Sequence, residues 1–177
     1  QIRCAELVIN NNIASSAVEG RVTHEVGSGL KPQATIKPIE NEALSVDSGR
    51  AKAIKKSLES CYRIWNSRFA DKRRQFTFDQ LQRQACRSFA TYGETFVVVG
   101  NATLGGMPLA LEVVNPQRVS TPTWKLDDKN CRLGIQYNDR DEIVGYWIRT
   151  THPGDTGIHY EYDWQLFERF DSAGQPR

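Results

Sequence analysis

The spacing of apolar residues divides this chain into a helical first part and a strand-rich second part. In most of the part from about residue 1 to residue 92, apolar side chains recur every three or four positions, the period of a helix with one buried face. From about residue 93 to residue 170 the period falls to two, the period of a half-buried strand. We therefore predict an α+β fold, in which N-terminal helices pack against a mainly antiparallel β-sheet.

The first 50 residues predict two helices followed by an extended segment. Residues 2–26 read as helical, with a break at residues 10–12, where asparagine side chains can accept hydrogen bonds from the free amides of the second helix. The segment 30–36 contains Pro32, which cannot donate to a strand ladder, so we expect an edge or irregular strand there. Residues 37–49 are expected to form a loop.

Two further helices follow. The helix from about residue 48 to residue 69 is predicted to be amphipathic and half buried, because one stripe contains Ile54, Leu58, Cys61, Trp65 and Phe69. The next helix begins after Thr77, which can form a capping box with Gln80. Gly93 is placed to end that helix in a left-handed conformation.

The second part predicts a series of strands joined by turns. The expected strands are Thr95 to Val99, Leu109 to Val114, Leu133 to Tyr137, Ile143 to Thr150, Ile158 to Tyr162 and Leu166 to Phe170. The polar residues 138–142 separate two alternating runs, which predicts a β-hairpin. The glycine-rich segment 100–106 lacks a following Lys-Ser/Thr, so we interpret it as a hairpin loop rather than a phosphate-binding loop.

The size and composition indicate one domain. A chain of 177 residues with 39% hydrophobic content can bury one ordinary core, so residues 1–177 are expected to form a single α+β domain. The chain opens at Gln1 rather than at a methionine, and we expect it to be a piece of a longer protein.

No apolar run approaches the roughly 20 residues that cross a bilayer, so no membrane contact is expected. The four cysteines are widely spaced, which favours free thiols in a reducing compartment over a zinc site.

Positive charge is concentrated in one segment. The formal net charge is +2, but residues 50–87 contain eleven Lys and Arg against three acids, a balance of +8 that leaves −6 for the rest. Within this segment Lys72, Arg73 and Arg74 are candidates for contact with nucleic acid or with another subunit, because closely spaced cations release counterions from a polyanion. No aromatic stacking pattern interleaves with these charges, so a solvated surface or a subunit contact is favoured over nucleic acid.

Catalytic motifs are scarce. The serines lie outside any nucleophile-elbow pattern, so we predict no enzymatic activity and no cofactor. His152, Asp155 and His159 fall in one predicted loop and could in principle meet at a metal, but their spacing fits no common ligand pattern. A turn at residues 153–154 is the favoured interpretation, and a metal-dependent enzyme remains the less favoured alternative.

Several segments, taken in order, resemble those of one known protein family. Asn10-Asn-Asn-Ile-Ala14 and Val26-Gly-Ser-Gly-Leu-Lys-Pro-Gln33 are similar to that family's opening, although Asn12 stands where proline is usual. Residues 78–97 resemble its F-x-x-L-Q, R-S and G-E-x-F-V segments. The hairpin at 133–149 and the following His152-Pro-Gly-Asp155 are similar to its G-I-x-Y-D and Y-W-I segments and its H-P-G-D loop. The family that these segments resemble is the lambda-type phage portal proteins.

The resemblance implies a structural rather than a catalytic role. Lambda-type portal subunits form a ring, usually of about twelve copies, at one capsid vertex, where DNA enters and leaves and where terminase and head-completion proteins dock. This chain would be the wing-like N-terminal part of such a subunit, located in the virion and, during assembly, in the host cytoplasm. Opposite faces of one chain meet in a head-to-tail ring, so the uneven charge, including Lys72, Arg73 and Arg74, could serve that contact. A basic nucleic-acid-binding module is the alternative.

Overall fold

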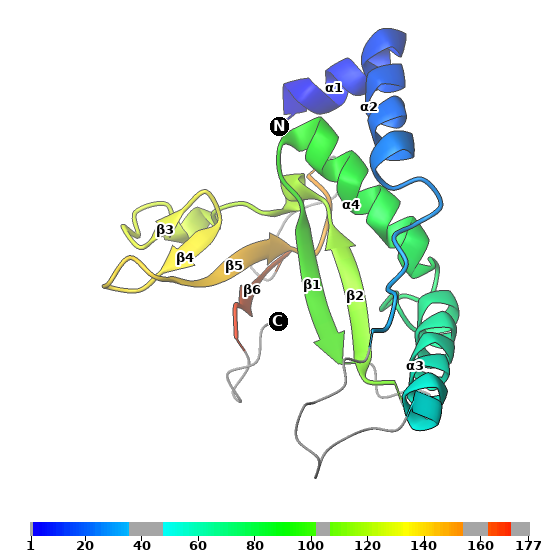
Figure 1. Ribbon diagram of the computed structural model, residues 1–177. Coiled ribbons are helices and arrows are strands. Elements are labelled where there is room, and N and C mark those ends of the chain that lie inside the picture. Colours follow the sequence, from blue (N-terminus) through cyan, green and yellow to red (C-terminus); the bar gives the residue numbers. More distant parts are fainter. Residues whose placement is uncertain (1, 36–47, 102–106, 154–162, 171–177) are drawn as a thin grey trace.

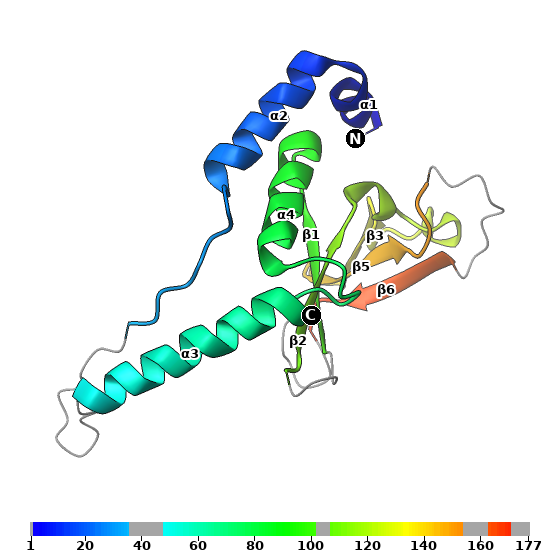
Figure 2. The same ribbon diagram turned by 90° about the vertical axis from the view of Figure 1, so that its right-hand side faces the viewer.

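The computed structural model describes residues 2–35, 48–101, 107–153 and 163–170. Within these ranges the chain forms four α-helices and two antiparallel β-sheets (Figure 1). The helices lie on one side of a long β-hairpin, and the second sheet lies on the other side (Figures 1 and 2). The predicted α+β class is confirmed, with the strands divided between two sheets rather than gathered in one.

The first two helices meet at an asparagine. α1 (Ile2–Asn10) and α2 (Asn12–Glu25) are separated by Asn11, whose side chain accepts hydrogen bonds from two backbone amides of α2 at 2.9 and 3.1 Å. These amides would otherwise lack a partner, which explains the break that the asparagine run predicts. α2 packs along α4 (Phe78–Tyr92) and fully buries Val22.

α3 (Ser48–Arg68) contacts the rest of the molecule mainly through its C-terminal end. There, the indole Nε1 of Trp65 donates to the carbonyl of Leu109 at 2.8 Å. Towards the N-terminus the helix extends away from the body (Figure 2), and its apolar residues Ile54 and Leu58 are exposed, Leu58 by 54%. The prediction of a half-buried stripe is wrong for this part, because none of the described elements covers it.

α4 begins and ends where its local signals predict. Thr77 accepts a hydrogen bond from the amide of Gln80 at 3.3 Å, and the Gln80 side chain accepts one from the amide of Thr77 at 2.8 Å, completing the capping box. Gly93 follows the helix with φ of +79°, a left-handed conformation that favours glycine. α4 buries Leu81 almost completely.

The first sheet is a two-stranded hairpin extended at one edge. β1 (Phe96–Asn101) pairs antiparallel with β2 (Leu109–Val114), with Phe96 opposite Val114. A short segment after α3 runs along the free edge of β2, because the amide of Leu111 donates to Ala70 at 2.7 Å and the amide of Lys72 donates to Leu111 at 2.9 Å. The end of α3 is thereby tied to the hairpin.

The second sheet has four strands in the order β3-β4-β5-β6, all antiparallel to their neighbours. Its strands are β3 (Cys131–Arg132), β4 (Ile135–Tyr137), β5 (Ile143–Arg149) and β6 (Trp164–Glu168). Short 3-10 helices at Pro116–Arg118 and Thr123–Lys125 lead into it from β2. One apolar core joins the two sheets and contains Val114, Val119 and Ile148, with Phe96, Val98, Tyr146 and Phe167 packed around them.

The predicted hairpin turn at residues 138–142 is confirmed. The Asn138 side chain accepts hydrogen bonds from the amides of Arg140 and Glu142, at 2.9 and 3.0 Å. The preceding strand is shorter than predicted, because Leu133 and Gly134 both have positive φ and form a two-residue turn between β3 and β4. The last strand begins at Trp164, two residues earlier than predicted, and ends at Glu168.

The extended segment after α2 does not form a strand. Its described residues, 30–35, make no strand pairing. Instead, the side chain of Gln82 holds Leu30, accepting from its amide at 2.8 Å and donating to its carbonyl at 3.2 Å. A side-chain partner therefore replaces the predicted strand neighbour.

The predicted strand at 158–162 lies outside the described residues. Across the described ranges, no helix combines the length and apolar composition of a bilayer-spanning segment.

Candidate contact surfaces

The predicted basic triplet lies in the loop that joins α3 to α4. A buried carboxylate organises this loop, because Asp71 accepts hydrogen bonds from the amides of three following residues, at 2.8 to 3.2 Å. Arg74 has a left-handed backbone, with φ of +56°, and its amide donates to the carbonyl of Asp71 at 3.0 Å. The loop therefore follows a fixed path, and Lys72, Arg73 and Arg74 leave it from defined positions.

Two of these three cations turn towards one acidic residue of β2. The Lys72 ammonium lies 3.1 Å from one carboxylate oxygen of Glu112, and the Arg73 guanidinium lies 3.0 Å from the other. Arg118 approaches the same carboxylate at 3.9 Å. The guanidinium of Arg74 lies over the ring of Phe69, 5.7 Å from its centre. Much of the triplet's charge is thus engaged within the chain.

Glu112 is held ionised by these neighbours. Its side chain is only 14% exposed, and this burial by itself favours the neutral carboxyl. The hydrogen bond from Lys72 and the charges of Lys72, Arg73 and Arg118 outweigh burial, so the pKa of Glu112 lies below its ordinary value. The pKa of Arg118 is lowered by burial, and the carboxylate of Glu112 opposes that shift.

The cations of α4 serve the packing of α2. The guanidinium of Arg83 donates to the carbonyl of Gly27 at 2.7 Å, and that of Arg87 pairs with Glu19 at 2.5 Å. These residues belong to the basic segment 50–87, but their charge faces a neighbouring helix. They hold α2 in place rather than forming a free basic surface.

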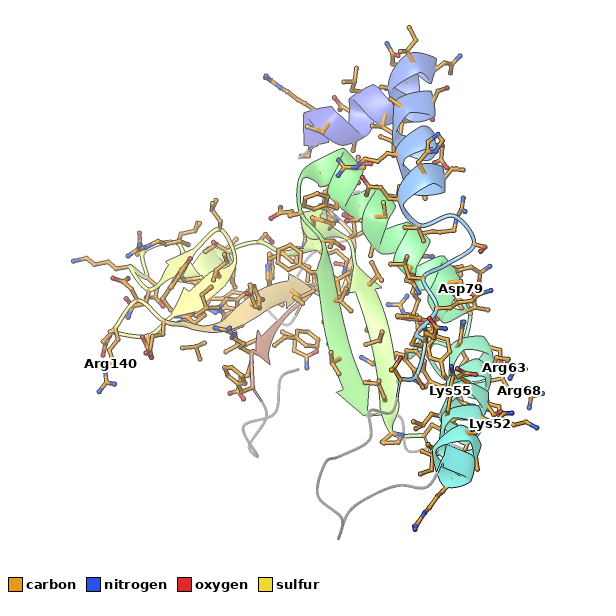
Figure 3. All side chains as sticks on the ribbon, in the orientation of Figure 1. Lys52, Lys55, Arg63, Arg68, Asp79 and Arg140 are labelled. Atoms are coloured by element: carbon orange, nitrogen blue, oxygen red, sulfur yellow. The ribbon has the colours of Figure 1, made fainter. Side chains whose placement is uncertain are left out.

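α3 carries the exposed part of the basic segment. It contains six Lys and Arg and a single acid, Glu59, and Figure 3 shows several of these side chains leaving the helix. Lys55 lies 3.8 Å from Glu59. Among the residues that the structure describes, Lys52, Lys56 and Arg63 make no ion pair. They recur at spacings of four and seven, which places them on one helix face. This spacing can be read from the sequence, but the prediction rested on the adjacent cations at 72–74 instead.

The possible metal site is only partly within the described residues. The imidazole Nε2 of His152 lies 3.4 Å from the side-chain nitrogen of Asn115. Asp155 and His159 lie outside the described ranges. Among the residues that are described, no three histidine, cysteine, aspartate or glutamate side chains gather as metal ligands. A metal-dependent site therefore stays the less favoured alternative, which the described residues do not test.

The motifs at residues 10–33, 78–97 and 133–155 lie within a longer stretch that matches a known family. Residues 1–172 match the family described as phage portal protein, lambda family. This chain belongs to the lambda family of phage portal proteins. It is 28% identical to portal protein B of Escherichia phage lambda over 151 residues, which cover 82% of this chain and 28% of the relative.

Two further relatives are portal proteins of other phages. The portal protein of Escherichia phage N15 is 28% identical over 172 residues, covering 90% of this chain and 31% of the relative. The probable portal protein of Halomonas phage phiHAP-1 is 21% identical over 120 residues, covering 66% and 23% respectively. The chain therefore spans less than a third of the length of these portal proteins. The family prediction is confirmed, whereas the role of Lys72, Arg73 and Arg74 stays a prediction.

Proposed function

We propose that this chain is the wing-like N-terminal part of a structural subunit of a phage or prophage portal. The subunits would form a ring at one capsid vertex, through which double-stranded DNA passes during packaging and ejection. Terminase, capsid and head-completion proteins would dock on that ring. The family match across residues 1–172 carries this proposal, and the three relatives named above are portal or probable portal proteins.

The proposal includes an architecture and a location. Residues 1–177 would form one α+β domain of a longer subunit, and the apolar core that joins the two sheets supports this division. The subunit would act as a structural protein rather than as an enzyme. It would be found in the virion and, during assembly, in the host cytoplasm.

The direct test is the native mass of the full-length protein, combined with negative-stain imaging of the same sample. We expect a ring of about twelve subunits with a central hole. A monomer or a dimer at concentrations where portals assemble would contradict the proposal. This measurement comes first because it does not depend on which surface makes the subunit contact.

A second candidate function is direct binding of duplex DNA, favoured by the cations of α3 that make no ion pair among the described residues. Such binding would weaken steeply with salt, because each phosphate contact that is formed releases counterions. Affinity for a duplex should then fall by roughly a factor of ten or more between 50 and 200 mM salt if three cations touch phosphates. Binding that is absent, or independent of salt, would argue against this candidate.

A further inference from the structure

An unusual leucine lies at the turn between β3 and β4. Leu133 is 87% exposed, and its φ of +52° is left-handed, a conformation that costs a branched apolar residue energy. Two-residue turns with positive φ at both positions favour asparagine followed by glycine. Gly134 fits this preference, and Leu133 does not. Residues held in sparsely populated backbone conformations cluster at functional sites, so Leu133 is a candidate for a contact with a partner.

The turn that carries Leu133 is rigidly supported. The amide of Gly134 donates to the hydroxyl of Thr121 at 2.9 Å, and its carbonyl accepts from the amide of Trp147 at 2.7 Å. A Cβ at Gly134 would lie 2.7 Å from the backbone nitrogen of Ser120, so this approach requires glycine. Leu133 is therefore presented from a fixed backbone, which lowers the entropic cost of ordering it on a partner.

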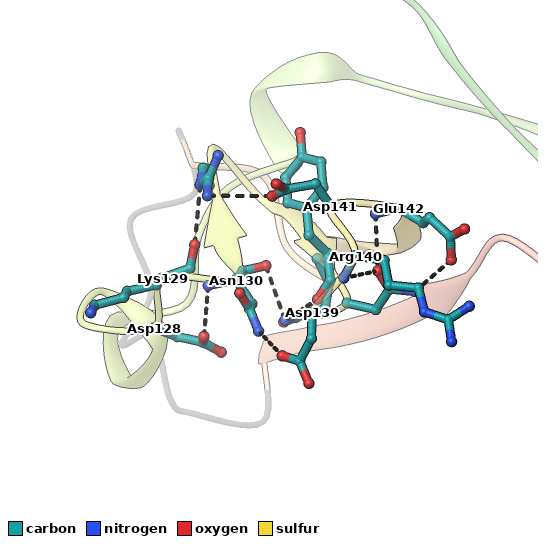
Figure 4. Close-up of polar contacts among 11 residues, drawn as sticks. Asp128, Lys129, Asn130, Asp139, Arg140, Asp141 and Glu142 are labelled. Atoms are coloured by element: carbon teal, nitrogen blue, oxygen red, sulfur yellow. Dashed lines mark hydrogen bonds and ion pairs between the residues drawn. The ribbon is translucent and has the colours of Figure 1, made fainter.

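The surface around this turn is acidic. We call residues 126–142, with β3, β4 and the turn to β5, the arm. It contains five acids against three bases, and Figure 4 shows its polar contacts. Asp139 accepts a hydrogen bond from Asn130 at 3.1 Å, and the 80% exposed Asp141 lies 3.6 Å from Arg132. The arm thus combines exposed leucines, at 126 and 133, with an excess of negative charge.

α3 offers the complementary features on the opposite side of the molecule. The β1–β2 hairpin lies between the arm and α3 (Figures 1 and 3). α3 is strongly basic, and its apolar residues Ile54 and Leu58 are exposed. Both surfaces therefore leave apolar side chains uncovered, and their charges are opposite in sign. Because they lie on opposite sides of one chain, the two surfaces can meet only between different copies.

We propose that the arm of one copy docks on α3 of the next copy. Leu133 would pack on the stripe at Ile54 and Leu58, while carboxylates of the arm would face Lys and Arg side chains of α3. Such a contact joins two different surfaces, so it is heterologous and repeats from copy to copy, and it forms a ring when the rotation between neighbouring copies closes. This inference rests on the proposed portal function and assigns the subunit interface of that ring.

A cysteine cross-link tests the contact with a native residue. Cys61 is exposed on α3, one turn after Leu58 on the same face. A Leu133→Cys variant of the full-length protein, assembled and mildly oxidised, should give a ladder of covalent dimers, trimers and larger species in denaturing gels. Adding Cys61→Ser should abolish the ladder, whereas Cys4→Ser, which removes the other exposed thiol of residues 1–177, should leave it intact.

The outcomes separate this inference from the proposed function. Rings that are seen by imaging but yield no ladder would overturn the contact between the arm and α3 and leave the portal proposal standing. A ladder that survives Cys61→Ser, or a product that stops at dimers, would also overturn it. Failure of the unmodified protein to form rings would instead count against the portal proposal, and the inference would fall with it.

A Leu133→Asn variant provides the second measurement. Asparagine is preferred at this turn position, so folding should be retained and the melting temperature should stay the same or rise. The fraction of protein in rings should fall several-fold, because the apolar contact is lost. Leu126→Asn, which changes an exposed leucine of the arm outside the turn, is the matched control and should reduce rings less. An unchanged ring fraction in Leu133→Asn would overturn the role assigned to Leu133.

Discussion

The loop after α3 and α3 itself are both rich in cations, but they differ in where those charges are satisfied. In the loop, Lys72 and Arg73 reach Glu112 within the same chain. On α3, Lys52 and Lys56 make no ion pair with any described residue. Charge that is satisfied internally contributes to folding, whereas charge left exposed is available for a partner. The comparison therefore moves the candidate contact surface from the loop to the helix.

The largest effect on stability is expected at the carboxylate that organises the loop. Asp71→Ala would leave three amide donors without their partner, so we expect a loss of about 3 kcal/mol in the free energy of unfolding. Urea denaturation of the variant and the parent chain measures this difference. Asp127→Ala, at an exposed acid of the arm, is the control and should change stability by less than about 0.5 kcal/mol. Equal effects at both positions would show that the loop is not organised as described.

The next effect concerns the partner of Lys72 and Arg73. Glu112→Gln would leave the half-buried Arg118 and two further cations without their counter-charge, and we expect destabilisation of about 2 kcal/mol at neutral pH. Glu59→Gln, which removes the acid of α3, should cost less than about 0.5 kcal/mol because that pair is exposed. If Glu59→Gln lowered the free energy of unfolding more than Glu112→Gln does, the charges of α3, rather than those of the loop, would be the ones that stabilise the fold.

The difference in stability between the parent chain and Glu112→Gln should also depend on pH. The pKa of Glu112 is lowered on folding, so its ionised form stabilises the fold fully above the ordinary value of a glutamate, about 4.3. That contribution is lost as the pH falls through the lower pKa of the folded state. The stability gap between the parent chain and Glu112→Gln should therefore narrow as acid is added below about pH 5. A gap that stays constant down to acid unfolding would exclude this linkage.

Local signals explain which parts of this structure were predictable. The capping box at Thr77 and Gln80, and the turn fixed by Asn138, involve residues at most four positions apart, so the sequence predicts them directly. The engagement of Lys72 with Glu112 spans 40 residues and depends on the segment after α3 pairing with β2. No sequence period encodes that register.

The stripe of α3 shows a second limit. The positions of Ile54 and Leu58 predict correctly that the helix has an apolar face, but the pattern does not tell whether the covering surface belongs to the same chain. Here the described chain leaves that face exposed. The same ambiguity applies to the basic face, since a run of lysines reads alike whether it is solvated or docked. The two basic regions are alike in composition, and only their positions in three dimensions show that charges of the loop are paired within the chain, whereas three cations of the helix make no ion pair among the described residues.

The smallest effect on stability is expected on α3, and it sharpens the comparison most. A triple variant with glutamine at positions 52, 56 and 63 removes three exposed charges, none of which makes an ion pair among the described residues. Glutamine is about as good a helix former as lysine or arginine, so the helix should be retained. The free energy of unfolding should change by less than about 0.5 kcal/mol. If α3 makes the proposed subunit contact, the ring fraction of the full-length protein, measured by native mass, should fall and become less sensitive to salt. Lys72→Gln is the matched control, because it should weaken the fold and leave the surface of α3 unchanged. A triple variant that assembles like the parent would mean that the charge of α3 is merely solvated, and the distinction between the two basic regions would then hold for folding alone.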